Sequence, residues 1–340
     1  MKHTIPQGKE VQVKRIFSVL VIAILVLVAA FSVSGKGEDS FVDESGTRIA
    51  VKKPFRRIIS LYGAHTENLF SLGLDREITG VSENEAYPPQ AMTKPVFSYH
   101  DDAEKFIAAR PDLVLIRPMI AQGYKNLIAK LEKAGITVVS LQPTTVDEMY
   151  SYWKRLGMLT GKEKKAEKMI EKFRTGLLEI NSIVKTIPPS EQKRVYFEAI
   201  HSQMKTFSPS SIAIFALKTA GGVNIADDAE AVRGTNIAAY GKERILSRAD
   251  EIDVYLAQKG TMNRSTVKTI AEEAGFKAIK AVRNREIYII DEKIVSRPTL
   301  RLLDGIYKIG RILYPDRFTT KIESRSWKPE FRICCFYSGS

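Results

Sequence analysis

The same order of secondary-structure signals occurs twice in this 340-residue chain, once in each half. In the first half, the hydrophobic pattern predicts a buried strand at 57–61, then a turn, then an amphipathic helix at 66–72. In the second half, it predicts a strand at 286–290, a turn, and a helix at 299–313. We therefore expect two similar α/β lobes, which would face each other across a cleft of the kind that binds ligands.

Between the two halves the pattern is mostly helical. Its second helix, Lys162 to Ile187, would be about 39 Å long at about 1.5 Å per residue, enough to connect two lobes. Strands alternate with helices on either side, which is typical of parallel sheets with crossover helices. The predicted fold is an α/β protein with two Rossmann-like lobes, mostly parallel sheets, a long connecting helix and a ligand cleft between the lobes. The predicted segments are a leader at 1–35, a first lobe at 36–145 that opens with a hairpin at 41–51, a helical connector at 146–190, a second lobe at 191–318 and a tail at 319–340.

The N-terminal segment has the features of an export signal. Lys14 and Arg15 precede an uncharged apolar run from Ile16 to Val33, and small residues follow it. We expect the mature chain to work in the periplasm or on the outer face of the cytoplasmic membrane. The run of about 18 residues is also just long enough to span a bilayer, so an uncleaved anchor is the alternative. No Cys lies directly after the run to accept a lipid.

The cysteines and the charge exclude several classes of protein. Cys334 and Cys335 are adjacent in the tail, so they close no useful loop, and no His lies near them. The net charge of +13 suggests a nucleic-acid partner, but Lys and Arg alternate with Glu along helices such as 162–174, as on a solvated face. There is no zinc spacing, and we expect no nucleic-acid partner. A basic surface instead favours anionic ligands or an anionic membrane.

No motif for catalysis is visible. The chain has no nucleophile elbow and no phosphate-binding loop, and Gly221-Gly222 lacks the dinucleotide fingerprint. The predicted core has no cysteines that could hold an iron-sulfur cluster. We therefore predict that the protein is not an enzyme and has no cofactor.

Several segments carry a resemblance through their order and spacing. They are RRIISLYGAHTENLFSLGLDREITGVS, AYPPQA, the pair DDAEKFIAARPDLVLI and GKERILSRADEIDVYLA, KLEKAGITVVSL, the run from Trp153 to Glu163, and AGGVNIA. From Phe41 to Phe318 the chain resembles the substrate-binding proteins of ABC importers for iron-siderophores, haem and cobalamin, the class whose two lobes are joined by one long helix. The resemblance implies a monomer that binds a small-molecule metal chelate and delivers it to a dimeric ABC permease.

The resemblance also implies a role for two acids. Glu104 and Glu243 each lie at the start of a short predicted helix that leads into an Asp and an apolar strand. In the family, the corresponding glutamates pair with arginines on the two permease subunits, which implies docking for both. The alternative is that each acid only complements its helix dipole, which is worth about 0.3 to 1 kcal/mol.

Turns at the C-terminal ends of the strands supply the candidate ligand-binding residues, because open α/β sheets bind ligands there. Aromatic rings can pack against a chelator, and Arg can hold carboxylate or catecholate oxygens. The candidates are Tyr62, His65, Tyr87, Tyr99, His100 and Arg117 in the first lobe and His201, Gln203, Arg233, Gln258, Lys259 and Arg297 in the second.

Some of these residues have simpler explanations. His65 could cap a helix, Tyr87 could stiffen a turn, and Arg297 could pair with a neighbouring acid. His100 and His201 could ligate a metal directly. Because the chain has four His, a chelated metal completed by one His or Tyr fits better than an all-protein cage.

The resemblance covers several classes of ligand. We expect an iron-siderophore first, then haem, then cobalamin, with an oxyanion such as molybdate as a further ligand of the family that arginines would suit. A membrane-tethered scaffold or adhesion protein without ligand transport is the alternative from another class.

Overall fold

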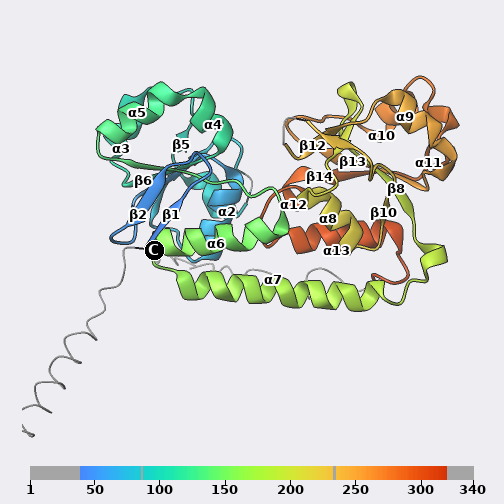
Figure 1. Ribbon diagram of the computed structural model, residues 1–340, viewed down its shortest axis with the longest axis horizontal. Helices are drawn as coiled ribbons and strands as arrows, with labels where there is room; N and C mark the ends of the chain where they lie inside the picture. Colours follow the sequence, from blue (N-terminus) through green and yellow to red (C-terminus); the bar gives the residue numbers. More distant parts are fainter. Residues whose placement is uncertain (1–38, 86, 233–234, 320–340) are drawn as a thin grey trace, which may run out of the picture. The chain divides into compact units, whose positions relative to one another are not determined.

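The computed structural model describes residues 39–85, 87–232 and 235–319 (Figure 1). The predicted leader and the segment with Cys334 and Cys335 fall outside these ranges. Residues 39–41 and 50–52 belong to one compact unit, and the features that follow the N-terminal hairpin lie in a second unit with described residues 42–49 and 53–319. Within the described residues, no helix combines the length and apolar character needed to cross a membrane.

The N-terminal hairpin forms as predicted. β1 (Asp39–Val42) and β2 (Arg48–Val51) make a two-stranded sheet. Gly46 in the turn has φ +85°, a left-handed conformation that glycine adopts without steric cost.

The first lobe contains a five-stranded, fully parallel sheet in the order β5-β4-β3-β6-β7. Its elements are β3 (Ile58–Ser60), α2 (Gly63–Ser71), β4 (Ile78–Ser82), the 3-10 helix η1 (Pro89–Thr93), β5 (Val96–Phe97), α3 (Ala103–Ala109), β6 (Leu113–Ile116), α4 (Pro118–Gly123), α5 (Lys125–Lys133) and β7 (Thr137–Ser140). All residues of β3 and β6 are buried, as expected for central strands of a parallel sheet covered on both faces. The carboxyl ends of these two strands therefore lie at the same edge.

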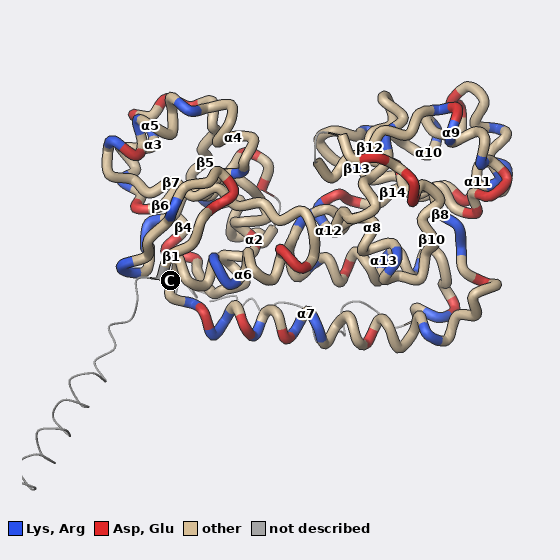
Figure 2. The backbone as a smooth tube through the Cα atoms, in the orientation of Figure 1, with Lys and Arg blue, Asp and Glu red and all other residues tan. Residues whose placement is uncertain are grey.

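Two helices link the lobes in sequence, α6 (Val146–Thr160) and α7 (Glu163–Val184). A capping box between Thr145 and Glu148 starts α6, and Gly161 ends it in a left-handed conformation. Buried residues recur on one face of α7, which packs against α6, α8 and α13. Figure 2 shows Lys, Arg, Asp and Glu interleaved along α7, as expected for a solvated face.

The second lobe has a mixed sheet. Its elements are η2 (Pro189–Glu191), β8 (Arg194–Ile200), η3 (His201–Gln203), β9 (Lys205–Phe207), α8 (Ile212–Thr219), β10 (Val223–Asn224), β11 (Glu230–Ala231), β12 (Ile237–Ala239), α9 (Lys242–Ser247), η4 (Ala249–Glu251), β13 (Val254–Lys259), α10 (Val267–Ala271), η5 (Phe276–Ala278), α11 (Lys280–Arg283), β14 (Ile287–Asp291), α12 (Glu292–Val295) and α13 (Leu302–Leu313). Strands β10, β8, β13 and β14 are parallel, whereas β9, β12 and β11 add an antiparallel edge that the sequence pattern did not predict.

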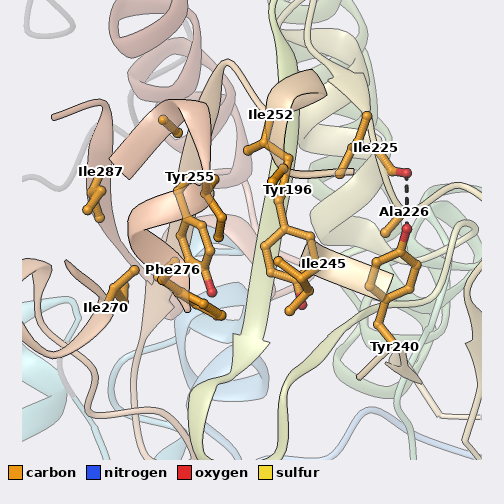
Figure 3. Packing of buried hydrophobic residues seen from close by; sticks show 14 of the residues in the cluster. Tyr196, Ile225, Ala226, Tyr240, Ile245, Ile252, Tyr255, Ile270, Phe276 and Ile287 are labelled. Atoms are coloured by element: carbon orange, nitrogen blue, oxygen red, sulfur yellow. Dashed lines mark hydrogen bonds between the residues drawn. The ribbon is translucent and has the colours of Figure 1, made fainter. Parts of the chain in front are cut away.

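Aromatic side chains pack with Ile and Ala side chains in the core of the second lobe (Figure 3). The ring of Tyr255 lies between Tyr196 and Phe276, with centroid distances of 5.2 and 5.8 Å. Tyr240 donates a hydrogen bond of 3.5 Å to the carbonyl oxygen of Ile225, which satisfies its buried hydroxyl group. This packing holds β8 and β13, whose carboxyl ends carry the polar residues considered below.

Candidate functional site

The carboxyl edge of the first sheet brings Tyr62 and Arg117 together. Tyr62 follows β3 and Arg117 follows β6, its parallel neighbour. The guanidinium carbon of Arg117 lies 4.8 Å from the centroid of the Tyr62 ring, within the range of a cation–π interaction. Two residues 55 positions apart thus form one surface, because their strands are adjacent.

Arg297 of the second lobe reaches the same tyrosine. Its guanidinium carbon lies 6.0 Å from the Tyr62 ring centroid, and the residue is 9% exposed. The neighbouring carbonyl oxygen of Pro298 accepts hydrogen bonds from Asn68 Nδ2 (2.9 Å) and Trp153 Nε1 (3.1 Å). These two bonds hold the segment that carries Arg297.

Gly63 makes the approach of Arg297 possible. A Cβ atom at this position would lie 2.2 Å from Nη1 of Arg297, closer than two unbonded atoms can come. The absence of a side chain at the first residue of α2 therefore leaves room for a guanidinium group beside Tyr62.

A second cation–aromatic pair lies near the first. The guanidinium carbon of Arg301 is 4.2 Å from the Tyr87 ring centroid, and Arg301 Nε donates a 3.0 Å hydrogen bond to Oε1 of Glu67. Glu67 and Arg301 are not among the residues predicted from the sequence. The available signal was the Glu within the first predicted helix and an Arg four positions after Arg297.

The electrostatics of this arginine–tyrosine group, formed by Tyr62, Tyr87, Arg117, Arg297 and Arg301, favour an anion. Arg117 Nε and Arg301 Nη2 are buried and have no hydrogen-bond partner in the described part of the chain. Burial raises the pKa of Glu67, although Arg301 opposes the rise. Burial also raises the pKa of Tyr62 against the effect of Arg297 and Arg117, so its hydroxyl group stays protonated at neutral pH. Arg117 and Arg301 therefore each keep a donor that an anion could use, while the carboxylates of Glu67, Glu85 and Glu292 act electrostatically on the same group.

A second carboxylate lies close by. Burial raises the pKa of Glu85, whose Oε1 accepts hydrogen bonds from Ser82 Oγ (2.6 Å) and Thr66 Oγ1 (3.0 Å). Those hydrogen bonds partly offset the effect of burial. The carboxylate is thus held by hydroxyl donors of its own lobe.

His65 does not contribute to the exposed surface of this site. It is fully buried within α2, with Nδ1 2.7 Å from the Tyr152 hydroxyl oxygen and Nε2 3.1 Å from the carbonyl oxygen of Ile116. A carbonyl only accepts, so Nε2 carries the proton and Nδ1 accepts from Tyr152. Burial lowers the pKa of His65 to about 3, which keeps the ring neutral. The residue links α2, β6 and α6, so the expectation that it contacts ligand is replaced by a structural role.

Tyr99 and His100 belong to a separate aromatic group with Tyr124. The ring centroids of Tyr99 and Tyr124 are 4.8 Å apart, and the Tyr124 hydroxyl oxygen lies 3.1 Å from His100 Nδ1. Tyr99 is half-buried and His100 is exposed. No contact in the described chain joins this group to Tyr62, so it forms a second aromatic surface of the first lobe.

The remaining candidates of the second lobe differ in burial. Gln258 is 2% exposed, and its amide donates to the carbonyl oxygen of Ala199 (3.2 Å) and accepts from Ser296 Oγ (2.9 Å), which indicates a structural role. Gln203 and Lys259 are exposed. Arg233 lies outside the described residues.

His201 lies at the carboxyl end of β8 in a buried polar cluster. Its Nδ1 is 2.7 Å from Oε2 of Glu198. That hydrogen bond raises the pKa of His201 against the effect of burial. Burial alone would raise the pKa of Glu198, but hydrogen bonds from His201, Tyr255 and Asn263 lower it. Across the residues with described positions, no group of three or more His, Cys, Asp or Glu side chains could hold a metal ion.

The two acids expected to dock on a permease are both exposed. Glu104 lies in the first turn of α3 and Glu243 in the first turn of α9. Neither carboxylate forms an ion pair with another residue of the described ranges. Each lobe therefore presents one unpaired acid at the start of a helix.

A pocket of about 300 Å³ lies elsewhere, at the amino ends of β13 and β14. Two of its lining residues, Asp253 and Lys280, form an ion pair of 2.7 Å, so their charges neutralise each other. Parallel sheets bind ligands at the opposite, carboxyl edge. We therefore assign the candidate site to the arginine–tyrosine group.

Comparisons with known proteins agree with this architecture. A family model described as periplasmic binding protein matches residues 58–294. The uncharacterized ABC transporter substrate-binding lipoprotein YvrC of Bacillus subtilis is 29% identical over 280 residues, which cover 81% of this chain and 85% of the relative. The vitamin B12-binding protein of Vibrio cholerae is 25% identical over 261 residues, which cover 76% of this chain and 89% of the relative.

A solved structure shows the same fold. The crystal structure of a possible iron-binding (periplasmic solute-binding) protein from Staphylococcus epidermidis superposes with a TM-score of 0.66 at 27% identity, over 77% of this chain and 100% of that one. The chain belongs to the periplasmic binding protein family. The predicted two-lobe α/β fold is thereby confirmed, and these relatives are substrate-binding proteins of transport systems.

Proposed function

We propose that this protein is an extracytoplasmic receptor that captures an anionic metal chelate, most simply a ferric siderophore, and delivers it to an ABC permease. The observation that carries the proposal is the Tyr62 ring with Arg117 and Arg297 both within 6.0 Å of its centroid. One guanidinium group can bind two oxygens of a carboxylate or catecholate at once, and the Tyr62 ring offers an apolar face to the organic part of a chelator. The unsatisfied guanidinium donors of Arg117 and Arg301 favour anionic complexes over neutral and cationic ones.

Cobalamin is the second candidate. It is favoured by the similarity to the vitamin B12-binding protein of Vibrio cholerae. A corrin carries little net charge, so its binding would use the aromatic surfaces and would depend weakly on Arg117. The two candidates therefore predict different effects of removing one guanidinium group.

Delivery would use the two exposed acids. Glu104 and Glu243 lie on different lobes, each in the first turn of a helix and each without an internal ion pair in the described chain. Two acids of this kind suit a permease with two subunits. Export would use the predicted leader. The Bacillus subtilis relative, named as a lipoprotein of an ABC transporter, supports a location outside the cytoplasm.

Titration of the purified protein with ferric siderophores, haem, cobalamin and molybdate tests the ligand. We expect a ferric siderophore to bind most tightly and Arg117→Ala to weaken that binding by about 1.5 to 3 kcal/mol, the worth of a hydrogen bond to a charged group. Arg174→Ala is the matched control, because Arg174 also lies over a tyrosine, 5.0 Å from the Tyr150 ring centroid, but on α7. Equal affinity of Arg117→Ala and Arg174→Ala would remove the arginine–tyrosine group from the site, and tight cobalamin binding that ignores Arg117 would establish the second candidate.

A further inference from the structure

A buried cluster of polar side chains surrounds His201 at the carboxyl end of β8. Glu198, 1% exposed, accepts hydrogen bonds from the Tyr255 hydroxyl group (2.5 Å), Asn263 Nδ2 (2.9 Å) and Ser265 Oγ (2.9 Å), besides the 2.7 Å contact to His201 Nδ1. All four partners can donate, and an ionised carboxylate only accepts. Glu198 is therefore held as a carboxylate in a fixed orientation.

The position of Glu198 decides which nitrogen of His201 carries a proton. Because the carboxylate of Glu198 can only accept a hydrogen bond, Nδ1 of His201 must carry the proton and donate it. In the neutral ring, Nε2 then has a free lone pair. His201 is 8% exposed, and its Nε2 is buried without a hydrogen-bond partner in the described chain.

Nε2 faces a second carboxylate at an unusual distance. Oε2 of Glu273 lies 3.6 Å from Nε2. This distance is too long for a hydrogen bond, whose donor and acceptor are normally about 2.7 to 3.2 Å apart. Two atoms that each lie about 2.1 Å from a metal ion are 3.6 Å apart when the angle at the ion is about 118°, close to tetrahedral. The separation of Nε2 and Oε2 is thus compatible with both atoms binding one cation.

We propose that Nε2 of His201 and the carboxylate of Glu273 bind a divalent transition-metal ion of the zinc, cobalt or nickel type. Imidazole nitrogen with one carboxylate suits these ions. The partners that orient such ligands are already in place: Glu198 accepts from the far nitrogen of the imidazole, and Lys242 Nζ lies 2.5 Å from the other oxygen of Glu273. Metal-binding histidines and carboxylates generally have such supporting partners.

Two features limit the affinity of this site. The protein supplies two ligands, so the remaining coordination positions are open to water or to groups of a bound chelator. The ammonium group of Lys242 also repels a cation at this distance. The site would take either an aqua ion or the metal of a chelate with free positions, and it does not depend on the function proposed above.

Cobalt binding by the full chain tests the site. All variants carry Cys334→Ser and Cys335→Ser, because thiols bind the same ions. Each is titrated with Co²⁺ alone and with Co²⁺ bound to one equivalent of nitrilotriacetate, which leaves two positions open, and the visible absorption of the ion is followed. We expect one of the two forms to bind, with His201→Gln and Glu273→Gln weakening it at least tenfold and Lys242→Met strengthening it. His100→Gln is the matched control and should bind as the parent does.

The two arms separate the sources of the metal. Binding of Co²⁺ alone indicates an aqua ion, and binding of the nitrilotriacetate complex only indicates the metal of a chelate. The proposal is overturned if neither form binds, or if Glu273→Gln binds as tightly as the parent. Glu273 has a partly exposed side chain (26%), so its variant is expected to fold even if the buried His201→Gln variant does not. Circular dichroism of each variant checks the fold.

Discussion

The absence of a side chain at Gly63 leaves room for Arg297 in the candidate ligand site. Gly63 has no positive φ, so its backbone would accept other residues, and what excludes them is the guanidinium group of Arg297. Because that group is the end of a flexible side chain, it can move away at small cost to the fold. A larger residue at position 63 is therefore expected to change the position of Arg297 in the site more than the free energy of unfolding of the protein.

Gly63→Ala is expected to displace Arg297 and weaken ligand binding without loss of stability. Alanine in a helix is favoured over glycine by up to about 1 kcal/mol, which offsets the local rearrangement. Affinity is measured by calorimetric titration and stability by urea unfolding. Gly123→Ala in α4 is the control, because a Cβ atom there would meet no atom within 4 Å apart from its chain neighbours and the backbone of its own helix. Unchanged affinity of Gly63→Ala would show that Arg297 does not contact the ligand.

The buried imidazole of His65 should make the protein sensitive to acid. Its pKa is about 3 in the folded chain, below the ordinary value of 6.5, so the unfolded chain binds an extra proton between these values. Stability is therefore fully present above about pH 6.5 and falls as the pH decreases toward 3, by about 1.4 kcal/mol per pH unit from this residue.

The contribution of His65 can be isolated by urea unfolding of the parent and of His65→Gln across this pH range. The difference between the two free energies of unfolding should shrink as the pH falls, because glutamine does not titrate. Parallel curves would mean that folding does not lower the pKa of His65. Groups such as Glu67 and Glu85 titrate in both proteins and cancel.

At the scale of elements, close backbone contacts fix the helices of the second lobe. A Cβ atom on Gly305 of α13 would lie 1.9 Å from the carbonyl oxygen of Ile294 in α12. Unlike the end of an arginine, a backbone oxygen cannot move without moving its helix. The contact positions the turn between α12 and α13, which includes Arg297 and Arg301.

Gly305→Ala is therefore expected to destabilise the protein by about 1 to 3 kcal/mol, the usual cost of overpacking. The midpoint of urea unfolding measures it, with Gly123→Ala again as the reference. A midpoint equal to that of the reference would show that α12 and α13 can separate freely. Ligand affinity should fall as well, since both arginines lie in the turn.

At the scale of the whole molecule, capture and delivery should be separable. Replacing Glu104 and Glu243 together by Lys should abolish uptake by cells, because like charges at an interface cost several kcal/mol. Ligand affinity of the purified protein should stay within about threefold, or roughly 0.7 kcal/mol. Asp102→Lys together with Asp250→Lys reverses two other exposed acids on the same two lobes and serves as the comparison. Normal uptake by the Glu104 and Glu243 double variant would return both acids to the role of helix-terminus residues.

The sequence by itself determined the alternation of strands and helices, the two lobes and the helical connector, because hydrophobic periodicity and Gly and Pro signals are local. It also placed Tyr62 and Arg117 after strands, where topology brings ligand-binding residues together, whereas Arg297, expected in a turn after a strand, follows the unpredicted short helix α12. It did not determine which candidates share one surface: His65 and Gln258 are equally polar in sequence, but burial and complete hydrogen bonding give them structural roles. The tertiary structure added Glu67 and Arg301 to the site and set Glu273 opposite His201. These pairings join residues far apart in the chain, and only the packing of the elements that carry them decides their distance.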